Sequence, residues 1–373
     1  MAAWALYRLP HADRYVRIRQ TSGEPEALLS CSQLNGREGF VVAPFDIRPD
    51  QPVLLIRADE RISEELRIKN EELRMKNEEF ATALPTSAAA NSISSAEEPT
   101  SAAANSSFFI LHSSFNNYAI DFANFHAQLQ AGTFRKIVLA RCADETTAEP
   151  VSPEELFLRA CQRYPRMFIA LVYTSQTGYW LTATPEILLD NEGQQWRTIA
   201  LAGTMKLEAD QLQGEGETVT WSTKNIQEQR YVATYITECL ERFVCDFHEE
   251  GPRTVRAANL VHLRSDFTFM LPDTDHLGDL LQTLHPTPAV CGLPKQDAFR
   301  FITHNEHTPR RYYSGFMGPI GPSTHLYVSL RCMNIEGSRY HLYAGGGLLK
   351  DSILEQEWLE TEAKLETMRS LLY

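Results

Sequence analysis

The sequence predicts an α+β fold, in which helices and hairpin-linked strands are mixed without a regular order. Two observations predict this class. Apolar runs of strand length such as 167–174 and 178–182 follow each other closely, which is typical of antiparallel strands. Long helical patterns lie between these groups of strands, without the βαβ alternation of a doubly wound sheet. The sequence also contains no G-x-G-x-x-G or P-loop string, so a nucleotide-binding fold is not indicated.

Hydrophobic periodicity and turn residues place the individual elements along the chain. Strands are expected within 37–57 and at 136–141, 167–174, 178–182, 186–190, 196–200, 260–269, 324–335 and 339–344. Helices are expected at 118–132, 152–163, 217–247, 295–304 and 351–372. At the start of the second helix, Ser152, Pro153 and Glu155 supply an N-cap, a first-turn proline and a capping-box acid.

Composition excludes several classes of protein. The chain has 373 residues, of which 43% are hydrophobic and 22% charged, so it can bury a large core. Its net charge of −13 argues against binding to nucleic acid. Apolar runs such as 40–45 are far shorter than the roughly 18 residues that span a bilayer, and the start lacks a signal-peptide pattern. We therefore expect a cytoplasmic protein without nucleic-acid or membrane partners, and seven reduced cysteines.

One segment differs from the rest of the chain. Residues 64–79 read EELRIKNEELRMKNEE, a seven-residue repeat that lacks the apolar seam of a coiled coil, and 81–107 are mostly Ala, Ser, Thr and Asn. Such a composition buries little surface, so we expect a disordered insertion over 62–117, with a partner-binding arm as the alternative. The insertion separates an N-terminal part of the fold, 1–61, from the main domain, 118–373.

Two carboxylates lie beside the apolar stripes of predicted helices. Glu228 precedes the stripe that begins at Val232, and Glu357 occupies a similar edge of the last helix. Glu228 could form a plain ion pair with Lys224 one turn earlier. Alternatively, Glu228 and Glu357 could share a hard cation such as Mg²⁺, which leaves open positions for a substrate carboxylate. The pattern alone leaves both interpretations open.

Charged residues and glycines also interrupt the apolar strands. Arg331 falls in the middle of an expected strand, where its planar guanidinium suits a bound carboxylate or a structural salt bridge. The backbone amides of Gly345, Gly346 and Gly347 could approach an anion or simply form a turn. Lys136 and Glu186 each begin a strand. In an apolar site they could serve as base and acid, whereas on the surface they would be plain charges.

Nine motifs follow one another over residues 118–373. They are KIVLAR (136–141), TATPEILL (182–189), ALAGT (200–204), KNIQEQRYV (224–232), LHPTPAVCGLP (284–294), RRYYSGFMGPIG (310–321), VSLRC (328–332), YAGGGLL (343–349) and EQEWLETEAKL (355–365). Together they resemble the chorismate-utilising enzymes, and among them the isochorismate synthases most closely. The resemblance implies one large α+β domain of packed antiparallel sheets with helices outside. Nothing in that family explains the insertion.

The resemblance also implies a role for each matching residue. Lys136 resembles the general base that activates a water to attack carbon 2 of chorismate, and Glu186 resembles the general acid that protonates the departing carbon 4 hydroxyl. Glu228 and Glu357 match the family's Mg²⁺ ligands. The residues that resemble substrate-binding groups are Gly203, Thr204, His285, Tyr313, Arg331, Gly345, Gly346 and Gly347. The implied enzyme is a Mg²⁺-dependent isomerase that acts on chorismate.

Two positions separate the branches of this family. Aminodeoxychorismate synthases usually carry a lysine at the place of Ala202, and anthranilate synthases usually lack one at the place of Lys136. The resemblance therefore implies water as the nucleophile and no glutaminase subunit. Salicylate synthases keep both residues and then eliminate pyruvate, so a salicylate synthase is one alternative and an inactive chorismate-binding paralogue is another. The opening ALYRLP (5–10) resembles the menaquinone branch more than the siderophore branch.

Overall fold

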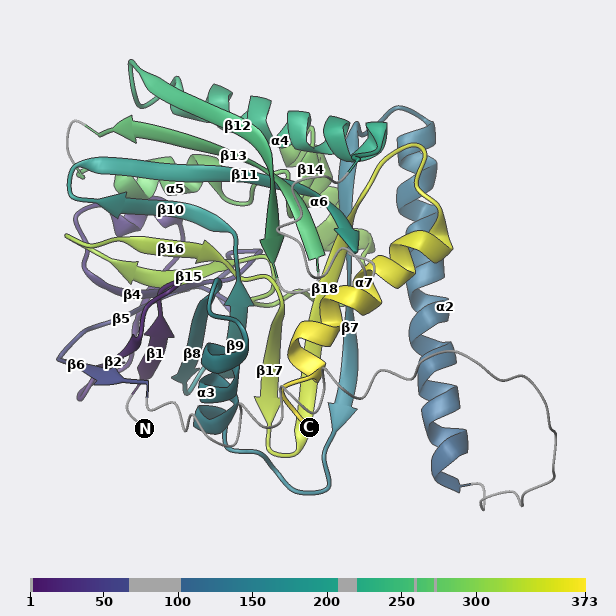
Figure 1. Cartoon of the computed structure of the whole chain (residues 1–373), viewed down its shortest axis with the longest axis horizontal. Helices are drawn as coiled ribbons and strands as arrows, with labels where there is room; N and C mark the ends of the chain where they lie inside the picture. The colour runs from purple at the N-terminus through teal and green to yellow at the C-terminus, as the bar shows by residue number, and fades with distance from the viewer. Residues whose placement is uncertain (1–2, 67–101, 207–219, 258–259, 272–273) are drawn as a thin grey trace.

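The protein, analysed as a computed structural model, consists of two antiparallel sheets packed face to face with helices outside (Figure 1). The structure describes residues 3–66, 102–206, 220–257, 260–271 and 274–373, with side chains described except in 102–114 and at 206, 257 and 260. Over these residues each sheet has nine strands. Phe168 and Tyr327, one from each sheet, stack with ring centroids 4.3 Å apart, so aromatic side chains fill the space between the sheets.

The strands of both sheets come from all parts of the chain. In spatial order, the first sheet contains β14 (Gly292–Leu293), β7 (Lys136–Thr146), β18 (Arg339–Leu348), β17 (Cys332–Glu336), β9 (Gly178–Thr184), β8 (Phe168–Thr174), β1 (Trp4–Arg8), β2 (Arg14–Arg19) and β6 (Glu60–Glu65). The second contains β12 (Phe247–Ala257), β13 (Leu260–Met270), β11 (Gln195–Lys206), β10 (Ile187–Glu192), β16 (His325–Val328), β15 (Phe316–Ile320), β4 (Gly39–Ala43), β5 (Val53–Ile56) and β3 (Glu26–Leu28). The N-terminal part of the chain is therefore built into both sheets.

Helices cover the outer faces and one side of this sandwich. They are η1 (Cys31–Leu34), α2 (Ala102–Gln130), α3 (Pro153–Arg163), α4 (Thr223–Leu240), α5 (Leu277–Leu284), α6 (Lys295–Asn305) and α7 (Leu354–Arg369). Helix α4 packs on β11 through Val232, Ile236 and Leu240, as the apolar stripe predicts. Helices α2 and α7 lie beside β7 and β18 (Figure 1). None of the helices in the described ranges is long and apolar enough to cross a membrane.

The α+β class is confirmed, and most expected elements are present, but two were placed wrongly. The helix expected over 217–247 is shorter, because α4 ends at Leu240 and Phe247 already begins β12. Residues 217–219 lie outside the described residues. Phe243 and Phe247 pack against the same core as the helix although they follow its last residue. Their spacing in the sequence therefore continued the apolar pattern of α4 and made the predicted helix too long.

The strand expected over 324–335 is broken in the middle. β16 belongs to the second sheet and β17 to the first, and Arg331 lies between them with a φ of 45°, a left-handed conformation that non-glycine residues rarely adopt. Ser329 donates its backbone N–H to Gly315 O at 2.8 Å, which holds the chain at this crossing. Arg331 therefore does not lie in mid-strand: it lies where the chain passes from one sheet to the other.

Other local expectations have mixed outcomes. Pro153 begins α3, but the Ser152 side chain makes no capping hydrogen bond. The expected insertion, 62–117, overlaps β6 at its start and α2 at its end, while 67–101 lies outside the described residues. Disorder there stays a prediction. Elements that the periodicity did not predict are β1, β2, β3, β6, β12, β14, β15, η1 and α5.

Candidate active site

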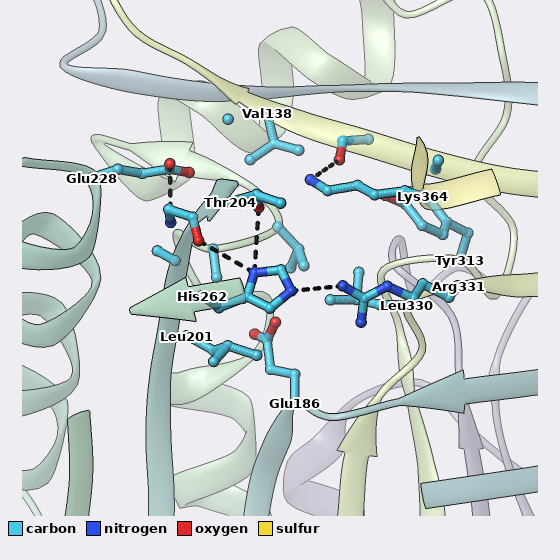
Figure 2. A pocket seen from close by; sticks show the side chains of 17 residues that line it. Val138, Glu186, Leu201, Thr204, Glu228, His262, Tyr313, Leu330, Arg331 and Lys364 are labelled. Atoms are coloured by element: carbon cyan, nitrogen blue, oxygen red, sulfur yellow. Dashed lines mark hydrogen bonds between the residues drawn. The ribbon is translucent and has the colours of Figure 1, made fainter. Parts of the chain in front are cut away.

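A pocket opens where the two sheets meet helices α4 and α7. Figure 2 shows Glu186 and His262 at its centre, Glu228 on one side, and Arg331, Tyr313 and Lys364 on the other. The lining residues are Val138, Glu186, Leu201, Ala202, Gly203, Thr204, Glu228, His262, Ala289, Val290, Tyr313, Leu330, Arg331, Ala344, Gly345, Gly347 and Lys364. Strands of both sheets thus line one cavity. Its polar side chains come from the second sheet, the helices and the connecting segments, and Val138 of the first sheet adds to the apolar wall.

Glu186 directly precedes β10 and is 3% exposed. Burial raises the pKa of its carboxyl to about 8, although the positive charges of Lys136, Arg331 and Lys364 oppose this rise. At neutral pH the carboxyl is therefore mostly protonated. A protonated carboxylic acid in a pocket of this kind can donate a proton to a leaving group.

Lys136 begins β7 and is completely buried. Its Nζ lies 3.0 Å from Oε1 of Glu228 on α4, so the two form a buried ion pair. Gly347, on the neighbouring strand β18, makes room for the pair. A Cβ at Gly347 would lie only 2.1 Å from Glu228 Oε1 and 2.9 Å from Lys136 Cε, so a side chain at this position would collide with both. Although burial acts to raise it, Lys136 and Lys224 hold the pKa of Glu228 below its ordinary value.

Glu357 lies in the first turn of α7. One of its oxygens is hydrogen-bonded to Lys224, and the other, Oε2, is buried without a hydrogen-bond partner. Lys224 therefore pairs with Glu357 rather than with Glu228, its neighbour one turn later in α4. Burial and the nearby Glu360 raise the pKa of Glu357, against the attraction of Lys224.

The surroundings of Glu228 and Glu357 fit a hard divalent cation. The two carboxylates approach β18 from different helices, and a Cβ at Gly346 would lie 3.3 Å from Glu357 Oε2. Bare glycine backbone, two buried carboxylates and one unpartnered oxygen make an oxygen-only donor set, which Mg²⁺ prefers. In the structure, Lys136 and Lys224 supply the positive charge that balances these carboxylates.

Arg331 lies on the side of the pocket opposite Glu228 and contacts the central His262 (Figure 2). Arg331 donates from one terminal nitrogen to His262 Nε2 at 2.8 Å, whereas its Nε and other terminal nitrogen are buried without partners. Burial lowers the pKa of Arg331 to about 10, so the guanidinium stays charged at neutral pH. A buried cation with unused N–H groups is suited to bind a carboxylate.

The remaining predicted residues differ in their placement. Gly203 has a φ of +69°, and its N–H donates to Glu228 Oε2 at 3.2 Å, which ties β11 to α4. Tyr313 lines the pocket beside Gly345, where a Cβ would lie 2.7 Å from the Tyr313 hydroxyl. His285 differs from the expectation. Its ring hydrogen-bonds with Pro44 O at 3.1 Å and packs on Phe316, so it points away from the pocket.

The structure therefore sorts the predicted site residues into three groups. Those that line the pocket are Glu186, Gly203, Thr204, Glu228, Tyr313, Arg331, Gly345 and Gly347. Lys136 and Gly346 lie directly behind this lining, because Lys136 pairs with Glu228 and Gly346 lies between two lining glycines; Glu357 lies beside Gly346. His285 belongs to neither group, and burial together with Lys295 lowers its pKa to about 3. Only Ala289 and Val290, further along the same loop, reach the pocket.

Sequence reasoning missed two polar residues of the site. His262 lies in β13 between the buried residues Val261 and Leu263. A polar residue inside an apolar run is the sequence feature that could have indicated it as a site residue. Lys364 lies two helical turns after Glu357, on the same face of α7. Its Nζ donates to Gly345 O at 2.8 Å and to Glu360 at 2.7 Å, which anchors α7 to the glycine strand.

Comparison with known proteins identifies the family. Residues 59–373 match the family described as chorismate binding enzyme. The chain belongs to this family. This chorismate-binding enzyme is 32% identical over 244 residues to isochorismate synthase MenF of Escherichia coli K12, which covers 65% of the chain and 56% of that protein. It is also 32% identical over 256 residues to isochorismate synthase DhbC of Bacillus subtilis, covering 65% and 64% respectively.

The fold of the enzyme agrees with a solved structure of the family. The crystal structure of MenF, the menaquinone-specific isochorismate synthase of Escherichia coli, superimposes with a TM-score of 0.74 and 23% identity, over 100% of this chain and 89% of that one. This likeness extends over both sheets and so includes the N-terminal strands. By sequence, the chain spans about three fifths of the length of the curated relatives it matches.

Proposed function

We propose that this enzyme is an isochorismate synthase, an isomerase that converts chorismate reversibly into isochorismate with the help of Mg²⁺. One observation carries the proposal: the protonated Glu186 lines the pocket, and the buried Lys136 lies directly behind its wall, 3.0 Å from Glu228 of the lining, so that the two residues flank one cavity from different sheets. A base and an acid placed in this way can activate a water and protonate a leaving hydroxyl in one site. The names of the relatives support the same reaction class.

The substrate is a dianion, and the pocket offers a cationic partner for each carboxylate. The two unpartnered nitrogens of Arg331 can bind one carboxylate in a bidentate manner. Glu228 and Glu357 would hold Mg²⁺, which when bound supplies positive charge for the ring carboxylate. Val138, Leu201 and Leu330 provide apolar walls against which the ring can lie.

The proposed reaction conserves all atoms. Lys136 accepts a proton from a water as the water oxygen bonds to carbon 2 of the ring. The double bonds shift, the bond between carbon 4 and its hydroxyl breaks, and Glu186 gives that hydroxyl a proton so that it leaves as water. One water enters and one water leaves, so the product is an isomer of the substrate. The same two residues exchange roles in the reverse direction.

The ion pair with Glu228 constrains when Lys136 can act. A general base needs a free lone pair, so Lys136 must be a neutral amine, and not the ammonium partner of the carboxylate 3.0 Å away, when it accepts a proton from water. Glu228 is also one of the two expected cation ligands. We therefore expect the Mg²⁺ requirement to reflect two effects, the binding of the substrate carboxylate and the release of Lys136.

Water is the expected nucleophile for a structural reason as well. Ala202 lines the pocket where a lysine would otherwise project, and the lysine of the lining, Lys364, is held by Gly345 and Glu360. An amine is thus not presented to the ring at this position. We accordingly propose a reaction without a glutaminase subunit. The cytoplasmic location expected from the sequence stays a prediction.

Product analysis tests the proposal directly. The purified chain is incubated with chorismate and Mg²⁺, with EDTA as control, and the products are identified by NMR. Isochorismate in equilibrium with chorismate is the expected result. Salicylate with pyruvate would identify a salicylate synthase instead, and the absence of any Mg²⁺-dependent product would identify an inactive paralogue.

We further propose that the product serves menaquinone rather than siderophore synthesis. The opening segment ALYRLP supports this assignment, since it resembles the menaquinone branch. Overall identity does not separate the two branches, because MenF and DhbC are equally similar to this chain. Complementation separates the two. A bacterial strain that lacks its menaquinone-specific synthase should regain menaquinone when it expresses this chain, whereas rescue of siderophore production alone would contradict the assignment.

A further inference from the structure

A second group of metal-binding side chains lies on β7 and β18, away from the pocket. Asp144 is paired directly with His341, and Cys142 with Tyr343, so these side chains project from the same face of the sheet. Lys136 is six residues before Cys142 on the same strand, which at about 3.3 Å per residue is about 20 Å. The group therefore belongs to a different part of the molecule from the proposed Mg²⁺ ligands.

The ligand atoms are close enough to share one ion. One potential ligand atom each of Cys142, Asp144 and His341 lies within 4.8 Å of the other two. Asp144 Oδ1 lies 2.6 Å from His341 Nδ1 and 3.8 Å from Cys142 Sγ. Ligand atoms of a tetrahedral zinc site are separated by about 3.3–3.8 Å, as follows from metal–ligand bonds of about 2.0–2.3 Å. The distance between Asp144 and Cys142 already fits this range, whereas the contact between Asp144 and His341 would need to open.

The outer surroundings of these side chains resemble those of bound metal ligands. The second ring nitrogen of His341, Nε2, lies 3.8 Å from a carboxylate oxygen of Glu336. A carboxylate behind the non-ligating nitrogen is the usual way in which proteins orient a metal-binding histidine. Tyr343 lies directly opposite Cys142 on the neighbouring strand β18. His341 thus already has a carboxylate near its second ring nitrogen.

We propose that Cys142, Asp144 and His341 form a site for a transition-metal dication such as Zn²⁺, with a fourth position left to water. Sulfur and imidazole ligands favour Zn²⁺ over Mg²⁺, so the site differs chemically from the carboxylate pair in the pocket. The Asp144 side chain is 66% exposed, which leaves a path for the ion from solvent. A bound ion would tie β7 to β18, the strands that carry Lys136 and the three glycines.

Binding must displace a proton from the thiol. A metal binds the thiolate and the neutral imidazole, so its apparent affinity should increase as the pH rises towards the alkaline range. An ordinary ion pair between Asp144 and His341 would show no such behaviour.

The test uses the full chain, stripped of metals with EDTA, in excess Mg²⁺ to occupy the pocket. Co²⁺ is the spectroscopic probe and Zn²⁺ the competitor. We expect one equivalent of Co²⁺ to give a thiolate-to-cobalt charge-transfer band with tetrahedral d–d bands, and Zn²⁺ to remove both. Cys142→Ser should abolish the charge-transfer band. Glu336→Gln should weaken Zn²⁺ binding by about 10–100-fold, and His341→Gln by at least as much.

Cys245→Ser is the matched control, because Cys245 is an exposed thiol with Asp246 and His248 close by in the chain. This variant should keep both the cobalt bands and the rise in melting temperature that Zn²⁺ causes in the wild type. The proposal is overturned if the charge-transfer band survives Cys142→Ser, or if Cys245→Ser removes it. Absence of Zn²⁺ binding in the wild type, or binding that His341→Gln leaves unchanged, would overturn it equally.

Discussion

The Nε2 atom of His262 accepts a hydrogen bond from the guanidinium of Arg331 at 2.8 Å. Arginine offers only donors, so Nε2 carries no proton, and Nδ1–H faces Gly203 O at 3.2 Å. Burial and the charge of Arg331 hold the pKa of His262 well below its ordinary value. His262 is therefore a neutral acceptor that orients Arg331 while the other guanidinium nitrogens face the pocket.

Removing this acceptor should weaken substrate binding. A hydrogen bond to a charged group contributes about 1.5–3 kcal/mol, so we expect His262→Leu to raise the KM for chorismate by about tenfold or more. The kcat should change less, because Lys136 and Glu186 remain in place. His262→Gln keeps an acceptor oxygen and should retain most of the affinity. Steady-state kinetics of both variants check this, and equal KM values for the two would contradict the positioning role.

The pH dependence of the reaction should report Glu186. The pKa of this carboxyl is raised to about 8, so the acid form is present below pH 8 and is lost as the pH rises through it. We expect kcat/KM with saturating Mg²⁺ to fall on the alkaline side with an apparent pKa of about 8. Glu186→Gln cannot donate this proton and should be inactive at every pH. A rate that stays constant up to pH 10 in folded enzyme would refute this assignment.

Lys136→Ala should abolish nearly all turnover while the protein stays folded. Loss of a general base costs about 10²–10⁴-fold in rate. The cavity left at this fully buried position adjoins Glu228, which keeps the positive charge of Lys224 nearby. Rates are measured with saturating chorismate and Mg²⁺, and circular dichroism follows the fold. Near-normal turnover would show that another group takes the proton from water.

Glu228→Gln should increase the Mg²⁺ concentration needed for half-maximal activity, by at least about tenfold. The amide removes one anionic ligand but preserves the size of the side chain. Glu362→Gln is the matched control, because Glu362 is a carboxylate of the same helix as Glu357 that pairs with Arg141 instead. Calorimetric titration with Mg²⁺ measures the affinity. An unchanged requirement in Glu228→Gln would remove this residue from the metal site.

Gly347→Ala tests the close contact between β18 and the ion pair. The new methyl group would lie 2.1 Å from Glu228 Oε1, so Glu228 or the strand must move. We expect a loss of stability of about 1–3 kcal/mol together with at least a tenfold loss of activity. Gly346→Ala should have a milder effect, because the atom nearest to its new methyl group would be Glu357 Oε2, at 3.3 Å. Thermal unfolding and kinetics of both variants give the comparison, and equal behaviour would argue against the contact.

Much of the architecture could be predicted from local patterns. Apolar spacing located α4 and α7, and it placed Glu228 and Glu357 at the edges of their buried faces. The same patterns did not reveal the N-terminal strands β1 and β2, whose pairing with β8 and β6 depends on distant segments. They also could not show the break between β16 and β17, because alternation continues through the crossing.

The sequence by itself determined the fold class, the carboxylates beside two helices and a mid-chain arginine in an apolar run. Only the tertiary structure decided the partners: Lys136 with Glu228, Lys224 with Glu357, and Arg331 with His262. It also turned His285 away from the pocket. The physical reason is that periodicity describes which face of one element is buried. Ion pairs and hydrogen bonds between elements depend instead on sheet register and on the packing of helices against strands.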